Sequence, residues 1–202
     1  MIAFKDIKLS DKPLFDRYLQ AKPYENSEFS FTNLFIWRLS YHFKYAIIND
    51  HLCIIEKFRD LYPSIFAPLS IGAADYATVL PILADYMHEQ GYPLILKTVT
   101  EKEKQEIESA LPNRIIFRED LNNSDYVYLS QDLIELKGKK FRQKRNHINK
   151  FIKSYPYEYE EMSDGNLQEC LETEFKWVSG RDGNKSVLEE KHAIGEIMNN
   201  FY

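Results

Sequence analysis

The chain has 202 residues, of which 44% are hydrophobic and 14% aromatic, so it can bury a substantial core and is not a disordered tail. Its formal net charge is -5, which argues against a surface that binds polyanions everywhere. No apolar run reaches the roughly 18 to 20 residues of a membrane span, and the N-terminus has no secretory pattern, so we expect a cytoplasmic protein without a transmembrane segment.

The first part of the chain alternates apolar strands with helical patterns. Asn49-Asp50 stands between two β-branched runs and predicts a hairpin turn. Thr100 with Glu103 forms a capping box, and Ser10 is a candidate N-cap. In chain order the patterns predict helices over 10–20 and 30–41, strands over 43–50, 51–58 and 65–72, a helix over 75–91, a strand over 92–100, a helix over 101–112 and a strand over 113–120.

A polar, turn-rich stretch at 119–125 marks a boundary, after which the alternation restarts. Ser186 with Glu189 reads as a second capping box. The patterns here predict a strand over 124–128, a helix over 137–156, a strand over 157–163, and helices over 164–183 and 186–202. We therefore predict an α/β (α+β) fold of two lobes, 1–122 and 123–202, each with a mixed sheet flanked by helices. The last helix has no stop signal, so we expect the second lobe to be incomplete.

The most informative feature is the cationic segment, residues 137–153, which holds eight Lys or Arg and no Asp or Glu. As a helix it would place Phe141, Ile148, Phe151 and Ile152 on one stripe, expected to face the core. Like charges three and four residues apart each cost a few tenths of a kcal/mol, so we expect something outside the helix to compensate them.

Phosphate is the compensating group that fits these side chains, because arginine binds its oxygens in pairs and lysine acts as a point charge. Gly138 would let backbone N–H groups approach an anion at the positive end of the helix. The alternative is a solvated basic face whose positive charge balances the excess negative charge of the rest of the chain. The candidate anion-binding residues are Lys139, Lys140, Arg142, Lys144, Arg145, Asn146, His147 and Asn149.

Four further residues are pocket candidates. Asn33 and Trp37 lie in an aromatic-rich helix whose simplest role is core packing, and Asp125 and Tyr126 directly precede the basic region. A carboxylate at Asp125 would act as a general base or pair with the nearby cations. His51 and Cys53 share one face of a strand but lack further ligands, so no metal site is expected. Cys53 and Cys170 are expected to be buried thiols in a reducing compartment.

Three stretches together carry a resemblance: YENSEFSFTNLFIW, SDYVY and LKGKKFRQKRNHINKF. They resemble the C-terminal domain of phosphatidylglycerol lysyltransferases and its stand-alone relatives, over essentially the whole chain. The resemblance implies two tandem GNAT-like acyltransferase lobes, the second related to the Fem ligases. Better known members move an aminoacyl group from tRNA onto a lipid head group. Members are usually longer, so the resemblance places the family's catalytic candidates beyond Tyr202, and catalytic residues stay unassigned.

These observations leave three functions open. The first is an acyl- or aminoacyl-transferase that binds aminoacyl-tRNA, an acyl-nucleotide or an anionic lipid head group on the cationic segment. The second is a non-catalytic RNA- or anion-binding module, and the third is peripheral contact with anionic lipid. Coenzyme A is the candidate cofactor, but the sequence lacks the Q/R-x-x-G-x-G/A loop that usually binds it. Residues 181–186 are only weakly similar to that loop.

Overall fold

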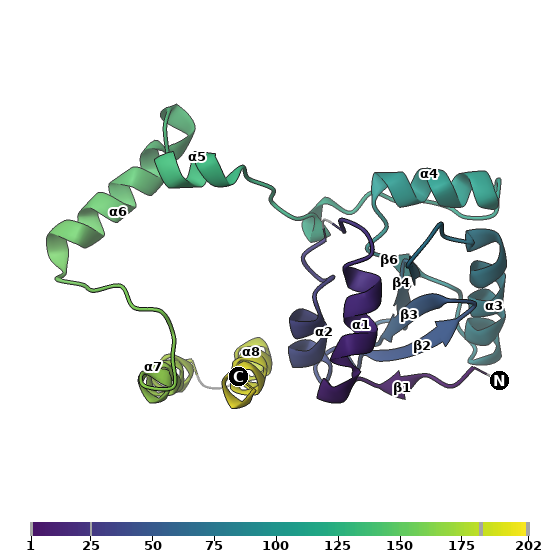
Figure 1. The fold of residues 1–202 in the computed structure, drawn as a ribbon, viewed down its shortest axis with the longest axis horizontal. Helices are drawn as coiled ribbons and strands as arrows, with labels where there is room; N and C mark the ends of the chain where they lie inside the picture. The colour runs from purple at the N-terminus through teal and green to yellow at the C-terminus, as the bar shows by residue number, and fades with distance from the viewer. Residues whose placement is uncertain (1, 25, 182–183, 201–202) are drawn as a thin grey trace. The chain divides into compact units, whose positions relative to one another are not determined.

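The computed structural model describes residues 2–24, 26–181 and 184–200 (Figure 1). Contacts divide the chain into a first unit, residues 1–119 with 173–202, and a second unit, residues 120–172. The segment 181–186, which is weakly similar to a coenzyme A loop, includes residues 182 and 183, which lie outside the described residues. The tandem-lobe organisation over 1–122 and 123–202 stays a prediction.

The first unit is built on a mixed sheet. The described residues form six strands in the order β1-β2-β3-β4-β6, with β5 also paired to β3. All pairs are antiparallel except β4 with β6. The strands are β1 (Lys5–Asp6), β2 (Lys44–Ile48), β3 (His51–Glu56), β4 (Ser64–Phe66), β5 (Leu69–Ser70) and β6 (Leu96–Lys97). A mixed α/β fold with an open sheet is thereby confirmed.

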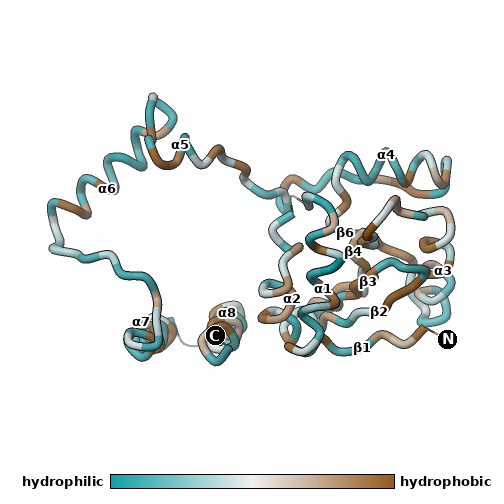
Figure 2. Tube along the Cα trace, viewed as in Figure 1, coloured by the Kyte–Doolittle hydropathy of each residue, from teal (hydrophilic) through white to brown (hydrophobic). Residues whose placement is uncertain are grey.

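Helices cover both faces of this sheet (Figure 1). Leu52 and Ile54 of β3 belong to one core, while Cys53 between them belongs to the other, as the alternation of a strand requires. The first core includes side chains of α1 (Lys12–Leu19) and α2 (Phe31–Trp37), and the second includes those of α3 (Tyr76–Glu89) and α4 (Glu101–Ala110). Because both faces of the sheet are covered, its central strands are rich in apolar residues, as Figure 2 shows.

Local signals explain most of these elements. Asn49 and Asp50 both have positive φ, 45° and 59°, which is the backbone of the predicted two-residue hairpin turn. Ser30 caps α2 through the backbone N–H of Asn33, and the predicted capping box of Thr100 with Glu103 opens α4. The hairpin and the α4 capping box are confirmed.

Two predicted caps are wrong. Ser10 lies inside a short 3₁₀ turn, η1 (Leu9–Asp11), and Asp11 is the N-cap of α1. Asn184, rather than Ser186, caps α8 (Lys185–Asn199), because its side chain accepts from the Ser186 N–H. The helix starts at a neighbouring polar residue in each case, one residue after Ser10 and two residues before Ser186.

Several predicted strands are absent from the described residues. The strand expected over 92–100 is only the two-residue β6, and the stretches 113–120, 124–128 and 157–163 form no strand. A strand is stable only where a neighbour satisfies its backbone, and β-propensity alone does not supply that neighbour. Tyr126 is 89% exposed, which shows how little packs on the second of these stretches.

The second unit is helical and contains η2 (Leu121–Asn123), α5 (Ser130–Glu135), η3 (Lys139–Phe141) and α6 (Arg142–Ser154). Phe141 is its one buried residue among those described. Ile148, Phe151 and Ile152 are about half exposed, so the predicted core-facing stripe is wrong for all three. α7 (Leu167–Ser179) runs across the division between the units.

The C-terminal helix α8 belongs to the first unit and packs against α2. Arg38 donates to Glu196 at 2.8 Å, and Arg59 donates to Glu189 at 2.9 Å. The Arg38 guanidinium also lies 3.9 Å from the centre of the Phe35 ring. Across the described part of the chain, no helix is both long and apolar enough to span a bilayer.

Candidate functional site

The cationic segment begins at a tight loop between α5 and α6. Leu136 ends α5 with a φ of 48°, and Gly138 has a φ of 84°. The Gly138 backbone is one that a residue with a Cβ rarely adopts, so this glycine fits the loop for a conformational reason. α6 then runs to Ser154 and stops before Pro156, where Tyr155 is extended.

Arg145 serves the loop itself. Its guanidinium donates to the carbonyl oxygen of Leu136 and, at 2.9 Å, to that of Gly138. These carbonyls follow the end of α5 and lack a helical partner there, so Arg145 satisfies them. Of the predicted anion-binding residues, Arg145 therefore has a clear structural role in the described loop.

Two lysines of the segment are paired with carboxylates. Lys140 lies 2.7 Å from Asp132, and Lys137 lies 2.7 Å from Glu135. The hydrogen bond from Lys137, followed by that from Gln131, lowers the pKa of Glu135. Both pairs are on the surface, where such ion pairs contribute little to stability.

The other five cations are exposed, and within the described residues none of them forms an ion pair: Lys139, Arg142, Lys144, Lys150 and Lys153. The start of α6 has no side-chain cap and no acid in its first turn. Lys139 and Arg142 thus stand at the positive end of the helix dipole, where an anion would be stabilised and a cation is not.

The predicted amides join these cations on one side of α6. With 100° between successive helical residues, Arg142, Asn146, Asn149 and Lys153 fall within an arc of about 60°. We call these four residues the polar ridge. It offers guanidinium, ammonium and amide donors along one line, which suits an extended anion. Lys144 and His147 lie outside this arc and are also exposed.

The other predicted candidates lie in different units. Asn33 of the first unit donates its backbone N–H to Ser30 and its side-chain amide to the Ser27 carbonyl at 3.4 Å. Trp37 is half-buried and meets Tyr41 edge-on, with ring centres 6.0 Å apart. Asp125 and Tyr126 are exposed in the second unit.

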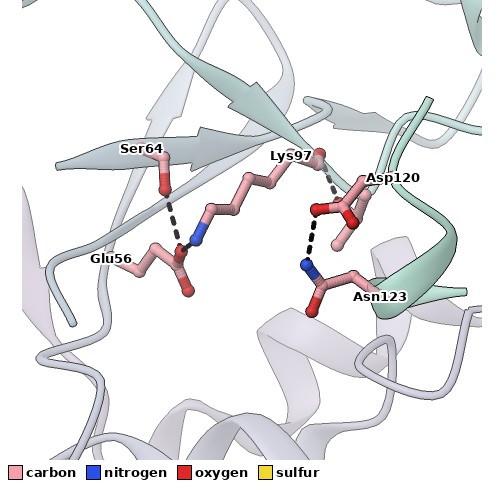
Figure 3. A network of polar contacts seen from close by, with 6 residues as sticks. Glu56, Ser64, Lys97, Asp120 and Asn123 are labelled. Atoms are coloured by element: carbon pink, nitrogen blue, oxygen red, sulfur yellow. Dashed lines mark hydrogen bonds and ion pairs between the residues drawn. The ribbon is translucent and has the colours of Figure 1, made fainter. Parts of the chain in front are cut away.

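Sequence reasoning missed a polar network in the first unit (Figure 3). Glu56 is buried at the end of β3, accepts a hydrogen bond from Ser64 at 2.8 Å, and is ion-paired with Lys97 of β6. Burial, followed by the Glu56 charge, raises the pKa of Tyr41. The available signal was an acid ending one apolar run and a lysine ending another. The two buried side chains, Glu56 and Ser64, are both hydrogen-bonded. The network therefore joins β3 and β6 to β4, which lies between them.

Figure 3 also shows a local turn at the start of the second unit. Asp120 accepts from the Asn122 backbone N–H at 3.2 Å and from the Asn123 side chain at 2.7 Å. This Asx turn opens η2 and supplies no group for a ligand. The described residues also contain no group of three or more His, Cys, Asp or Glu that could hold a metal ion.

Comparisons with known proteins found one family and one solved structure that are similar to this chain. The family described as phosphatidylglycerol lysyltransferase, C-terminal, matches residues 20–202. A solved structure, the crystal structure of a conserved protein of unknown function from Bacteroides thetaiotaomicron VPI-5482, is 35% identical with a TM-score of 0.86. That match covers 100% of this chain and 68% of that chain. No curated protein matches the sequence.

Proposed function

We propose that this chain, which belongs to the phosphatidylglycerol lysyltransferase C-terminal family over residues 20–202, is an acyl- or aminoacyl-transferase-like protein that holds an anionic donor or acceptor on its cationic segment. The family supports lysyltransferase-like transfer in general terms. The finer parts of the proposal are the two GNAT-like lobes and the anionic substrate. Aminoacyl-tRNA, an acyl-nucleotide or an anionic lipid head group each supply the required phosphate.

The observation that carries the proposal is the set of five exposed cations that lack a carboxylate partner among the described residues. The mutual repulsion of these cations, and the place of Lys139 and Arg142 at the start of α6, both disfavour the free segment. A bound phosphate would offset both effects, because a charged hydrogen bond to it contributes about 1.5 to 3 kcal/mol. The polar ridge gives this phosphate several donors at once.

Transfer from an activated ester needs little from the protein beyond placement of the two reactants. Holding the ester and the attacking amine or hydroxyl in contact removes much of the entropic barrier, and fixed donors stabilise the oxyanion that forms. A dedicated nucleophile is not required. The proposal therefore gives the cationic segment a binding role and leaves the reacting groups unassigned.

The test is a transfer assay with tRNA that carries a radiolabelled lysyl group and vesicles that contain phosphatidylglycerol. We expect labelled lipid, and we expect the double variant Lys139→Gln with Arg142→Gln to lower kcat/KM at least about tenfold, because two charged hydrogen bonds are lost. Lys102→Gln with Lys57→Gln is the matched control, since both lysines are exposed in the first unit. Label transfer no faster than without protein would contradict the proposal for this chain.

A non-catalytic RNA- or anion-binding module is the second candidate, because the polar ridge requires no chemistry to bind phosphate. Its signature is affinity that falls with salt, by about 0.7 log units per neutralised phosphate for each log unit of salt on single strands, without any turnover. Measuring binding and transfer on the same protein separates the two candidates.

A further inference from the structure

The first unit has two buried carboxylates among its described residues, and only one of them has a cation beside it. Glu56 is 4% exposed and is paired with Lys97. Glu103 is 8% exposed and forms no ion pair with a described residue. Its Oε2 accepts from the Thr100 N–H at 2.8 Å and from the Thr100 hydroxyl at 2.9 Å. The capping box therefore accounts for one oxygen of Glu103, while Oε1 stays without a partner in the described chain, which is costly for a buried carboxylate.

A buried tyrosine near Glu103 also lacks a hydrogen-bond partner. Tyr76, the first residue of α3, is 3% exposed, yet its hydroxyl forms no hydrogen bond with a described residue, although buried tyrosine hydroxyls normally find one. Burial, followed by the charges of Glu103 and Glu106, raises the pKa of this hydroxyl. The hydroxyl and Glu103 Oε1 are both open to solvent, because Glu174 Oε1 is the one described side-chain atom that is shut off from solvent without a partner.

The loop after α1 joins the starts of α3 and α4. Tyr24 donates its hydroxyl to the carbonyl oxygen of Ser70, at the end of β5, at 3.4 Å. Asn26 donates its side-chain amide to the carbonyl oxygen of Thr98, two residues before the N-cap of α4, at 3.0 Å. The charges of the two α4 carboxylates raise the pKa of Tyr24 as well, after the larger effect of burial. We call Tyr24, Tyr76, Glu103 and Glu106 the tyrosine–glutamate cluster.

Charge and free acceptor atoms decide which ligand fits this cluster. Two carboxylates repel an anion. A divalent metal ion needs about six oxygen ligands, and the described residues hold no group of three or more His, Cys, Asp or Glu that could bind one. A primary ammonium has one positive charge and three N–H donors. These match Glu103 Oε1 and the hydroxyl oxygens of Tyr24 and Tyr76, which are three acceptors.

We infer that the tyrosine–glutamate cluster binds the ammonium group of a small primary alkylamine, with Glu103 as its counter-charge and the two phenols as further acceptors. Glu106 is exposed one turn after Glu103 and adds to the attraction. The inference goes beyond the proposed function, because this ligand site of the first unit requires neither an anion on the polar ridge nor transfer.

The test is titration of the ¹⁵N-labelled full chain with n-butylammonium chloride near neutral pH, where the amine is protonated, followed by amide chemical shifts. We expect saturable shifts at the starts of α3 and α4. Tetramethylammonium chloride, which has the same charge and no N–H donor, should give none. Glu103→Gln should raise the Kd at least about tenfold, because the charge is lost while glutamine still completes the capping box. Tyr76→Phe should raise it about fivefold without lowering the Tm, since the hydroxyl has no hydrogen bond to lose.

Three further variants keep the test specific. Glu108→Gln removes an exposed carboxylate of α4, and Tyr86→Phe removes the hydroxyl of a half-buried tyrosine of α3; both should keep the wild-type Kd. Lys22 donates to the Ser70 hydroxyl at 2.7 Å and is the internal competitor to exclude. Lys22→Gln should also leave the Kd unchanged.

Four outcomes would overturn the inference. They are no saturable shift, which would leave only water at the cluster; equal shifts with tetramethylammonium; a wild-type Kd in both Glu103→Gln and Tyr76→Phe; and binding that appears only in Lys22→Gln, which would make the chain's own lysine the occupant. This site and the proposed function fail separately. Butylammonium binding without label transfer keeps the site and loses the proposed function, and label transfer without butylammonium binding does the reverse.

Discussion

His51 joins two parts of the first unit through both of its ring nitrogens. Its Nδ1 lies 2.6 Å from the Asn49 carbonyl oxygen, and its Nε2 accepts from the Asp75 backbone N–H at 3.0 Å. The side chain is buried, so these are contacts that water cannot easily replace. This one residue therefore fixes the hairpin turn to the first turn of α3.

His51→Ala should lower the free energy of unfolding by about 1 to 3 kcal/mol, because it removes a buried side chain and its two part-buried hydrogen bonds. Chemical denaturation with urea measures the change. His88→Ala, at an exposed position on α3, should stay within about 0.5 kcal/mol of the wild type. Equal effects of the two substitutions would show that the His51 contacts do not stabilise the unit.

Cys53 links the stability of the first unit to alkaline pH. Burial raises the pKa of its thiol from 9.0 to about 12. The unfolded chain therefore releases this proton at a lower pH than the folded chain, and the free energy of unfolding should fall as the pH rises from about 9 towards about 12. Burial likewise raises the pKa of Tyr76, with the same sign.

The Cys53→Ala variant should show a shallower loss of stability above about pH 9, although it is less stable overall because a small cavity forms. Urea titrations at a series of pH values give the slope. Val79→Ala is the control, since Val79 is fully buried in the same core and does not ionise. If both variants kept the wild-type slope, Cys53 would not be the source of the pH dependence.

At the scale of elements, the helix α8 shows how a distant segment completes the first unit. It follows the second unit in the chain yet packs on α2, at whose end Glu196 meets Arg38, and its Glu189 meets Arg59 in the turn after β3. The side chains of Arg38 and Glu196 are only 19% and 22% exposed, so their ion pair is shielded from water more than a surface pair.

Glu196→Ala should loosen α8, with amide hydrogen exchange across 185–199 about fivefold to tenfold faster, because a partly shielded ion pair contributes about 1 to 1.5 kcal/mol, somewhat more than an exposed pair. Glu190→Ala is the matched control, since Glu190 is an exposed glutamate of the same helix. If exchange rose equally in both variants, apolar contacts alone would hold α8 on the first unit.

The elements that could be predicted from sequence are those specified by short-range signals. They are the Asn49-Asp50 turn, the Thr100–Glu103 capping box and the 3.6-residue period of α6. In each of them, the residues that specify the structure are only a few positions apart in the chain. The strands expected over 113–120 and 157–163 were wrong because pairing depends on a distant neighbour, which composition does not specify.

The candidate site also has one part that the sequence predicted and one part that it did not. Its charge is local, so sequence alone located the cationic segment. The role of Arg145 depends on the backbone of Leu136 and Gly138 folding towards it, and the pairing of Lys140 depends on Asp132 eight residues away across a loop. Neither contact could be read from spacing, because both require the loop to be built first.

At the scale of the molecule, the two units differ in how they are stabilised. The first has a sheet with an apolar core on each face, whereas the second has Phe141 as its one buried side chain among the described residues. Under the proposed function, an anion bound on the polar ridge would stabilise this unit by mass action.

The central claim is that the cationic segment binds an anionic partner, and the salt dependence of polyanion binding tests it most directly. The measurement is the affinity for single-stranded polyuridylate across a salt series, for the wild type and for a variant with glutamine at positions 139, 142, 144 and 150. We expect the variant to lose about 0.7 from the salt slope for each phosphate contact removed, while glutamine at Lys8, Lys57, Lys102 and Lys185 leaves the slope unchanged. Equal slopes for the two variants would contradict the claim.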